Sequence, residues 1–261
     1  MKLRRVFSLV KLEMIRQLID PLVLVFTTLL VPVLILIFGL IMKDNYGWGP
    51  DYTIFEHMLP GFLAYAGLLT IYDVAAGVAS ERETGIQKRI NTTPLTTAEY
   101  IISQMVSYSI KPIIQLAVGL SVAVAVGYRP LIFFGTTYSI GAKLAGCVLV
   151  IAFMVIFSFC SVGFGLITAS FAKTANAAGG LAFAFIVPQQ LFGSFIPPYI
   201  FGINGIGWAM PSWYAARGMG MLFGGTSFYF WEIWVRLGVL LAISIAVYIV
   251  GILLYERKKR R

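Results

Sequence analysis

Few side chains in this sequence could do chemistry within its apolar segments, and the first are the adjacent Tyr72 and Asp73. Intramembrane aspartyl proteases use a Tyr-Asp pair with an aspartate on a second helix, because two carboxylates must share a proton. No second aspartate lies within an apolar segment of this sequence. The pattern therefore argues against proteolysis. Lys111, the only base within an apolar segment, is instead a candidate ion-pair partner for Asp73, because charges inside a membrane usually have partners.

Metal, disulfide and nucleotide chemistry have little support in the sequence. His57 is the one histidine, and a lone interfacial histidine is typical of a surface residue rather than a metal ligand. Cys147 and Cys160 lie within one apolar segment and are interpreted as small core residues. No G-x-x-x-x-G-K-[ST] loop occurs, so ATP hydrolysis by that route is not expected of this chain. We expect no metal or cofactor on it.

The composition indicates what kind of elements carry these residues. Apolar residues make up 59% of the 261 residues, charged residues only 12%, and the mean hydropathy is +0.87. Several apolar segments reach the roughly 20 residues that a helix needs to cross hydrocarbon. The sequence predicts an all-α integral membrane protein forming a single transmembrane domain over residues 1–261. Its six spans are predicted at about 22–42, 58–79, 101–128, 144–172, 174–195 and 237–255.

The distribution of positive charge predicts the orientation of these spans. With the N-terminus inside, 14 of the 20 Lys and Arg residues fall on the cytoplasmic side, five on the opposite side, and Lys111 within a span. The positive-inside rule then places both termini in the cytoplasm. A removable signal peptide is not expected, and the plasma (inner) membrane is the expected location. The net charge of +9 is interpreted as affinity for anionic lipid headgroups, not for nucleic acid.

Residues 1–20 show a different pattern, in which apolar residues recur at helical spacing among basic ones. This pattern predicts an amphipathic helix lying along the cytoplasmic interface. The alternative is simple anchoring by positive charge. The apolar positions are Leu3, Val6, Phe7, Val10, Met14 and Leu18.

Residues 195–218 are apolar but interrupted by prolines and glycines, among them Pro197, Pro198 and Pro211. Such a segment cannot form one straight helix, and broken backbone at membrane depth needs protein or a water cavity to satisfy its polar groups. We predict a short re-entrant helical hairpin dipping in from the outer face. An aromatic interfacial loop is the alternative.

The polar stretch from Ser80 to Tyr100 falls on the cytoplasmic side between the second and third spans. It reads S-E-R-E-T-G-I-Q-K-R-I-N-T-T-P-L-T-T-A-E-Y. Gly85 permits a sharp change of chain direction, and a threonine at 96 or 97 can cap the helix that leads into the third span.

With this stretch the sequence resembles the ATP-binding cassette type 2 permeases, the membrane subunits of exporters for drugs, polysaccharides and lipids. The resemblance rests on Glu81 to Gly85, on Thr93-Pro94-Leu95, on Glu99-Tyr100 opening the next span, and on the order of elements along the whole chain. In that family the corresponding segment is a coupling helix that docks on an ATPase subunit, and the outer hairpin helps to close the exit of the path.

The resemblance therefore implies a permease that a separate ATP-binding cassette ATPase drives, with ATP and Mg²⁺ bound on that partner. It also implies a homodimer or a heterodimer with a homologous permease, surrounded by membrane lipids, that exports an amphipathic, lipid or glycan-type substrate. Asp73, Lys111 and the three prolines become candidates for the path or its gate. The residues implied to contact the ATPase are Glu81, Arg82, Glu83, Thr84, Gly85, Thr93, Pro94, Leu95 and, in the turn after the fourth span, Lys173.

Two other classes of function remain open. An ATP-independent channel or secondary transporter usually has several ionisable groups near the midplane, whereas this sequence offers only Asp73 and Lys111. A membrane-embedded enzyme has no constellation of residues to support it.

Overall fold

The structure is a computed structural model that describes residues 7–12, 14–15, 21–42, 53–86, 97–131, 139–195, 204–227 and 229–259. The described residues form helices and connecting turns, with no β-strand among them. This confirms the all-α prediction for this part of the chain. The elements are α2 (Pro21–Met42), α3 (Ile54–Glu83), α5 (Thr97–Val126), α7 (Ile140–Phe171), α8 (Ala175–Pro188), the π-helix η1 (Gln189–Phe195), α9 (Asn204–Gly207), α10 (Pro211–Phe223) and α11 (Trp231–Lys259).

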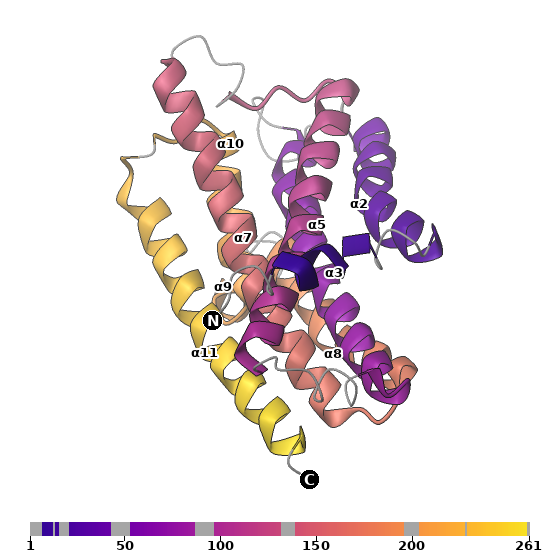
Figure 1. The fold of residues 1–261 in the computed structure, drawn as a ribbon. Helices are drawn as coiled ribbons and strands as arrows, with labels where there is room; N and C mark the ends of the chain where they lie inside the picture. Colours follow the sequence, from indigo (N-terminus) through magenta and orange to yellow (C-terminus); the bar gives the residue numbers. More distant parts are fainter. Residues whose placement is uncertain are drawn as a thin grey trace.

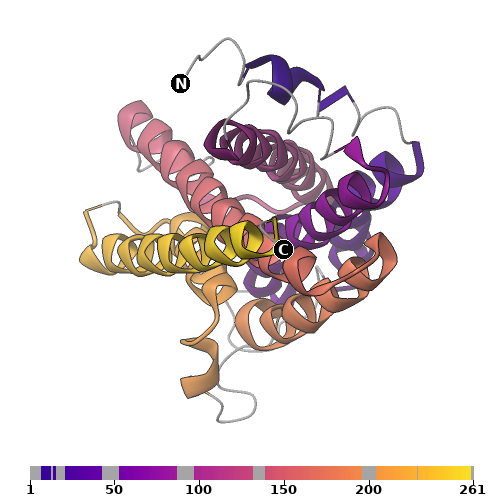
Figure 2. The ribbon, with the colours of Figure 1, turned by 60° about the horizontal axis from the view of Figure 1, so that its bottom comes forward.

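Helix α3 is the centre of the bundle. It packs against α2, α5, α7, α8, η1 and α10, and in Figure 2 it lies between α5 and α8. Its start is fixed by a capping box, in which the Thr53 hydroxyl accepts the Glu56 N–H and the Glu56 carboxylate accepts the Thr53 N–H. The most apolar window of α3 is 72% buried. Polar groups within this window are therefore held mostly among other helices, whereas His57 and Glu83 near the two ends of α3 are exposed.

Five helices are long and apolar enough to cross a membrane: Ile54–Glu83, Ile102–Val126, Ile140–Phe171, Ala175–Phe195 and Trp231–Tyr255. They correspond to the second to sixth predicted spans. The predicted first span, 22–42, coincides with α2, but only Leu29–Met42 qualifies as a shorter apolar helix. The chain is thus a multi-pass membrane protein with five candidate spans, and the count of six stays a prediction.

Several helices extend beyond the predicted spans, because caps rather than hydropathy set their ends. Helix α3 begins one residue after its cap Thr53, four residues before the predicted span. Helix α7 likewise follows Ser139, whose hydroxyl accepts the Ala142 N–H. A hydropathy window registers apolar length but not these polar first turns.

Helix α11 packs mainly on α7, and the two helices lie side by side in Figure 1 and converge in Figure 2. They approach closely where both carry glycine: a Cβ on Gly163 would lie 3.0 Å from the backbone N of Tyr248, and one on Gly251 would lie 2.8 Å from the Gly163 carbonyl oxygen. Small residues at a helix crossing allow this close approach in membrane proteins. The Ser244 hydroxyl adds a hydrogen bond of 3.1 Å to the carbonyl of Ile156.

The N-terminal segment is helical at residues 7–12 and 14–15 and lies alongside α5 (Figure 2). Val10 is buried there, and the Ser107 hydroxyl of α5 lies 3.5 Å from the Val10 carbonyl oxygen. Phe7 and Leu12 remain exposed. The predicted helical character is confirmed for these residues, and the position at the membrane interface stays a prediction.

Candidate functional site

The polar segment that follows the second predicted span begins inside the last turn of α3. The helix ends at Glu83, and the Thr84 N–H and hydroxyl both donate to the Ser80 carbonyl, each over 2.9 Å. Gly85 has a φ of +72°, a conformation that side chains with a Cβ rarely adopt. The sharp turn predicted at Gly85 is therefore confirmed. Residues 87–96, which include Thr93, Pro94 and Leu95, lie outside the described residues.

Glu81 points into the bundle rather than outward. It is only 4% exposed, and its carboxylate accepts hydrogen bonds from the Tyr100 hydroxyl and, at 3.5 Å, from Gln104 Nε2. Both partners lie on α5, which follows the polar segment in the sequence. A buried carboxylate needs such partners because burial of an unpaired charge is costly. Glu81 therefore ties the end of α3 to the first turns of α5.

Arg82 connects the same turn to a different part of the chain. Its Nη2 donates to the carbonyl of Ala169 at 3.0 Å and to that of Ala172 at 2.6 Å. Ala169 lies in the last turn of α7, whose final carbonyls have no partner within the helix. A cation at this position also complements the negative end of the helix dipole. Arg82 thus holds the short turn between α7 and α8, which contains Lys173.

Several residues around the two turns are exposed, and four of them concern the predicted ATPase contact. Glu83 ends α3, Thr84 and Ile86 follow it, and Lys173 lies between α7 and α8. Ile86 is 40% exposed although it is apolar. We call Glu83, Thr84, Ile86 and Lys173 the Glu83 surface. The residues of the predicted coupling segment therefore divide into two buried or half-buried anchors, Glu81 and Arg82, and an exposed set.

Asp73 and Lys111 form an ion pair inside the bundle. Lys111 Nζ lies 2.7 Å from Asp73 Oδ2, and the side chains are 13% and 8% exposed. Asp73 is about 15 Å from Glu83 along α3, at 1.5 Å per residue, so the pair lies well inside the spanning region. The proposed pairing is thereby confirmed. Asp73 is engaged with a cation, and the described residues contain no cluster of three metal-binding side chains.

The segment predicted as an outer re-entrant hairpin is only partly described. Pro211 is the first residue of α10, a position that suits proline because its N–H would have no partner there. Helix α10 continues to Phe223, beyond the predicted limit of 218, and packs against α3, α7, η1 and α11. Pro197 and Pro198 lie outside the described residues. The hairpin itself stays a prediction.

The π-helix η1 was not foreseen in the sequence. It follows Pro188, which has no N–H for the α-helical hydrogen bond, and π-turns often occur at functional positions. The Ser212 hydroxyl of α10 donates to the Gln189 carbonyl at 2.7 Å. The sequence signal that could have indicated an irregular helix here is Pro188 followed by two adjacent glutamines at the end of an apolar run.

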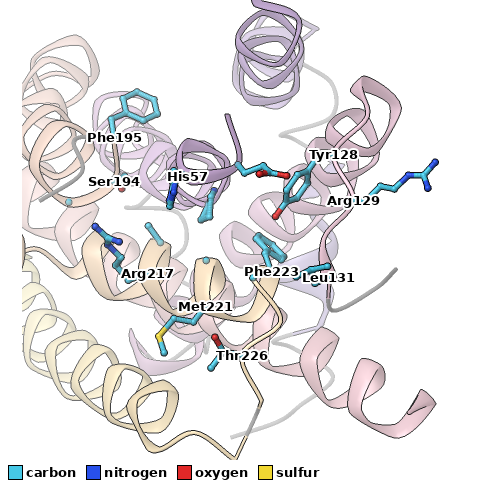
Figure 3. A pocket seen from close by; sticks show the side chains of 17 residues that line it. His57, Tyr128, Arg129, Leu131, Ser194, Phe195, Arg217, Met221, Phe223 and Thr226 are labelled. Atoms are coloured by element: carbon cyan, nitrogen blue, oxygen red, sulfur yellow. The ribbon is translucent and has the colours of Figure 1, made fainter. Parts of the chain in front are cut away.

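A cavity of about 340 Å³ lies at the Thr53 end of α3, between α3, α10, η1 and the residues after α5. We call it the Arg217 cavity. Its charged and titratable lining residues are Glu56, His57, Tyr128, Arg129 and Arg217. In Figure 3, His57 and Arg217 come from facing helices, whereas Arg129 points away from the other labelled side chains. His57 is exposed, as the sequence predicted, and it also lines the cavity, whereas no sequence pattern assigned Arg217 a role at a site.

Both cysteines are free thiols, as expected, with Cys160 buried and Cys147 partly buried. Neither lies at one of the polar sites described above.

Comparison with known proteins adds one finding. The family model described as ABC-2 type transporter matches residues 4–223, which is most of the chain. No curated protein matches the sequence. The matched range includes the polar turn after α3, the Asp73–Lys111 pair and most of the lining of the Arg217 cavity.

Proposed function

Since this chain belongs to the ABC-2 type transporter family, we propose that it is the permease subunit of an ATP-binding cassette exporter that a separate ATPase drives. The family supplies the membrane domain of a transporter and not the ATPase. ATP and Mg²⁺ would bind on the partner. The proposal adds that the Glu83 surface is the place where the ATPase acts on this chain.

The observation that carries the proposal is the double attachment of the turn after α3. Glu81 fixes the turn to α5 through Tyr100, and Arg82 fixes it to the end of α7 through two carbonyls. A force applied to this turn would therefore reach three helices and the start of α8 at once. A loop attached only by its own backbone would absorb such a force by bending.

The Glu83 surface has the chemistry of a small docking site. It offers an exposed apolar side chain, Ile86, beside the carboxylate of Glu83, with Lys173 on the neighbouring turn. An exposed apolar residue flanked by charges is typical of the centre and rim of an interface. Thr93, Pro94 and Leu95 belong to the same proposed contact.

The transport path forms a second part of the proposal. Two copies, or this chain and a homologue, would enclose a path for an amphipathic, lipid or glycan-type substrate in the plasma membrane, with both termini in the cytoplasm. Asp73 and Lys111 would stabilise the bundle next to that path. Pro197, Pro198 and Pro211 would shape its outer end.

The test is co-purification of the full chain, in mild detergent, with an ATPase subunit identified by its peptides and by ATP hydrolysis. Ile86→Asp and Glu83→Lys should each reduce the amount of bound ATPase about tenfold, the change expected when an interface residue worth about 1.4 kcal/mol is lost. Lys143→Glu, a charge reversal at the first turn of α7 near the opposite end of the bundle, should leave association unchanged. If both Glu83-surface variants bind as much ATPase as the unaltered chain, the proposal is wrong.

An ATP-independent channel or secondary transporter is a second candidate, and the Asp73–Lys111 pair is the observation in its favour. Ionisable groups within membrane spans often mark ion or substrate pathways. The purified chain in liposomes without ATPase should be inactive if the first proposal holds. Transport that persists there, and that Asp73→Asn abolishes, would favour the second candidate.

A further inference from the structure

The Arg217 cavity lies at the opposite end of α3 from the Glu83 surface. Glu56 lines the cavity and Glu81 anchors the polar turn, so the two sites are about 37 Å apart at 1.5 Å per residue. The cavity volume of about 340 Å³ is at the lower end of the range for ligand sites, roughly 300–1,000 Å³. It therefore suits a small group rather than a whole lipid or polysaccharide.

The polar groups of the cavity are mainly hydrogen-bond donors. Arg217 offers a guanidinium and His57 an imidazole. The one carboxylate, Glu56, already accepts the Thr53 N–H at 2.9 Å in the capping box and lies at the positive end of the α3 dipole. Arg129 also belongs to the lining, although its side chain points away from the other labelled side chains (Figure 3). This balance favours an anion.

Ser194 adds a further donor on the η1 side. Among the described residues, its buried hydroxyl oxygen has no hydrogen-bond partner. Gln189 precedes Ser194 by five residues, the spacing of a π-helical hydrogen bond, and Gln190 precedes it by four, but neither glutamine is part of the cavity lining. They are 3% and 7% exposed, and side-chain atoms of both also lack partners within the described part of the chain. Buried polar atoms usually have a hydrogen-bond partner, and of these three residues Ser194 is the one that lines the cavity and could find a partner there.

Most of the remaining lining is apolar, apart from the hydroxyl groups of Tyr128 and Thr226. Phe195, Phe223 and Met221 surround the polar groups, with Pro60 and Leu131 beside them. Figure 3 shows Phe223 and Met221 on α10 and Phe195 at the end of η1. Donors for an anion beside apolar walls form a combined site for a charged head and the first carbons of an attached chain.

We propose that the Arg217 cavity binds the anionic headgroup of an amphiphile, with Arg217 as the main charged contact, His57 and Ser194 as further donors, and Phe195 and Phe223 against the adjoining chain. The assignment of the cavity to the export path rests on the proposed function. The assignment of anion binding rests only on the residues that line the cavity.

The experiment measures binding of dodecyl phosphate to the full chain in nanodiscs of phosphatidylcholine, with empty nanodiscs as the baseline. Arg217→Gln should weaken binding about tenfold, because a charge-assisted hydrogen bond to the headgroup is lost. Arg217→Lys should retain most of the affinity, since the charge remains. This variant separates loss of charge from loss of folding. Lys143→Gln, a cation outside the cavity lining, is the matched control and should bind as the unaltered chain does.

Two other probes test whether the cavity requires both the negative charge and the attached alkyl chain. Dodecyl trimethylammonium has the same chain and the opposite charge and should not bind above the baseline. Inorganic phosphate has the charge without the chain and should bind at least tenfold more weakly than dodecyl phosphate. Equal affinity of Arg217→Gln and the unaltered chain would overturn the proposal, as would equal affinity for either of these probes.

The outcome is separable from that of the ATPase proposal. Arg217→Gln should leave ATPase association unchanged, and Ile86→Asp should leave dodecyl phosphate binding unchanged. Loss of dodecyl phosphate binding in Ile86→Asp would show that the two ends are not independent sites and would overturn the assignment to this cavity.

Discussion

Lys111 Nζ donates to Asp73 Oδ2 over 2.7 Å, and this contact joins α5 to α3 within the membrane-spanning part of the bundle. Burial of two charges is offset only when they stay together, because removing one partner leaves the other uncompensated.

Asp73→Asn or Lys111→Met alone should therefore destabilise the protein by about 3 kcal/mol, and the double variant should lose much less than the sum. The measurement is thermal unfolding of all four proteins in the same detergent. Additive losses would show that the pair contributes no coupling energy.

Arg82→Gln should loosen the end of α7. The carbonyls of Ala169 and Ala172 lose a charged donor, and hydrogen bonds to charged groups contribute about 1.5–3 kcal/mol. Amide hydrogen exchange in the turn after α7 should rise, and the melting temperature should fall. Lys173→Gln, an exposed change in the same turn, is the control and should alter neither quantity. Unchanged exchange in Arg82→Gln would mean that the turn holds without this contact.

Tyr100→Phe removes the hydroxyl that donates to the buried Glu81 carboxylate. An unsatisfied buried group costs about 1–3 kcal/mol, so the melting temperature should fall. Tyr229→Phe removes a hydroxyl from a residue that is 81% exposed and should have little effect. Equal melting temperatures of the two variants would contradict the anchoring role of Glu81.

Gly163→Ala should force α7 and α11 apart, because the added Cβ would lie 3.0 Å from backbone atoms of Tyr248. Overpacking of this kind costs about 1–3 kcal/mol. Gly180→Ala in α8 is the matched control, since a Cβ there meets nothing within 4 Å among the described residues. The control should match or exceed the stability of the unaltered chain, because alanine favours helix over glycine. Thermal unfolding checks both, and a Gly163→Ala protein as stable as the control would show that the crossing can widen freely.

Much of the architecture could be predicted from the sequence because its causes are local. Apolar length predicts spanning helices, since backbone groups in lipid must be satisfied within the helix. The same is true of the turn at Gly85, where one residue's conformational freedom decides the geometry. The resemblance carried by Glu81 to Gly85 led to the family that the match over residues 4–223 shows.

The roles of individual residues within the sites depended on tertiary structure. Glu81 and Glu83 are both carboxylates at the end of one helix, yet one is buried against Tyr100 and the other exposed. Helix rotation decides between them, and the packing of α5 fixes that rotation. The contact between Arg82 and Ala172 joins residues 90 positions apart, which no local pattern encodes.

The sequence by itself thus determined that Asp73 and Lys111 are the charged residues of the predicted spans, because no other Asp, Glu, Lys, Arg or His lies in those ranges. Only the tertiary structure decided that they meet, since α3 and α5 must bring both to the same depth and face. The Arg217 cavity likewise depends on tertiary structure. Its walls come from four separate parts of the chain, and only their packing brings the cationic and apolar groups together.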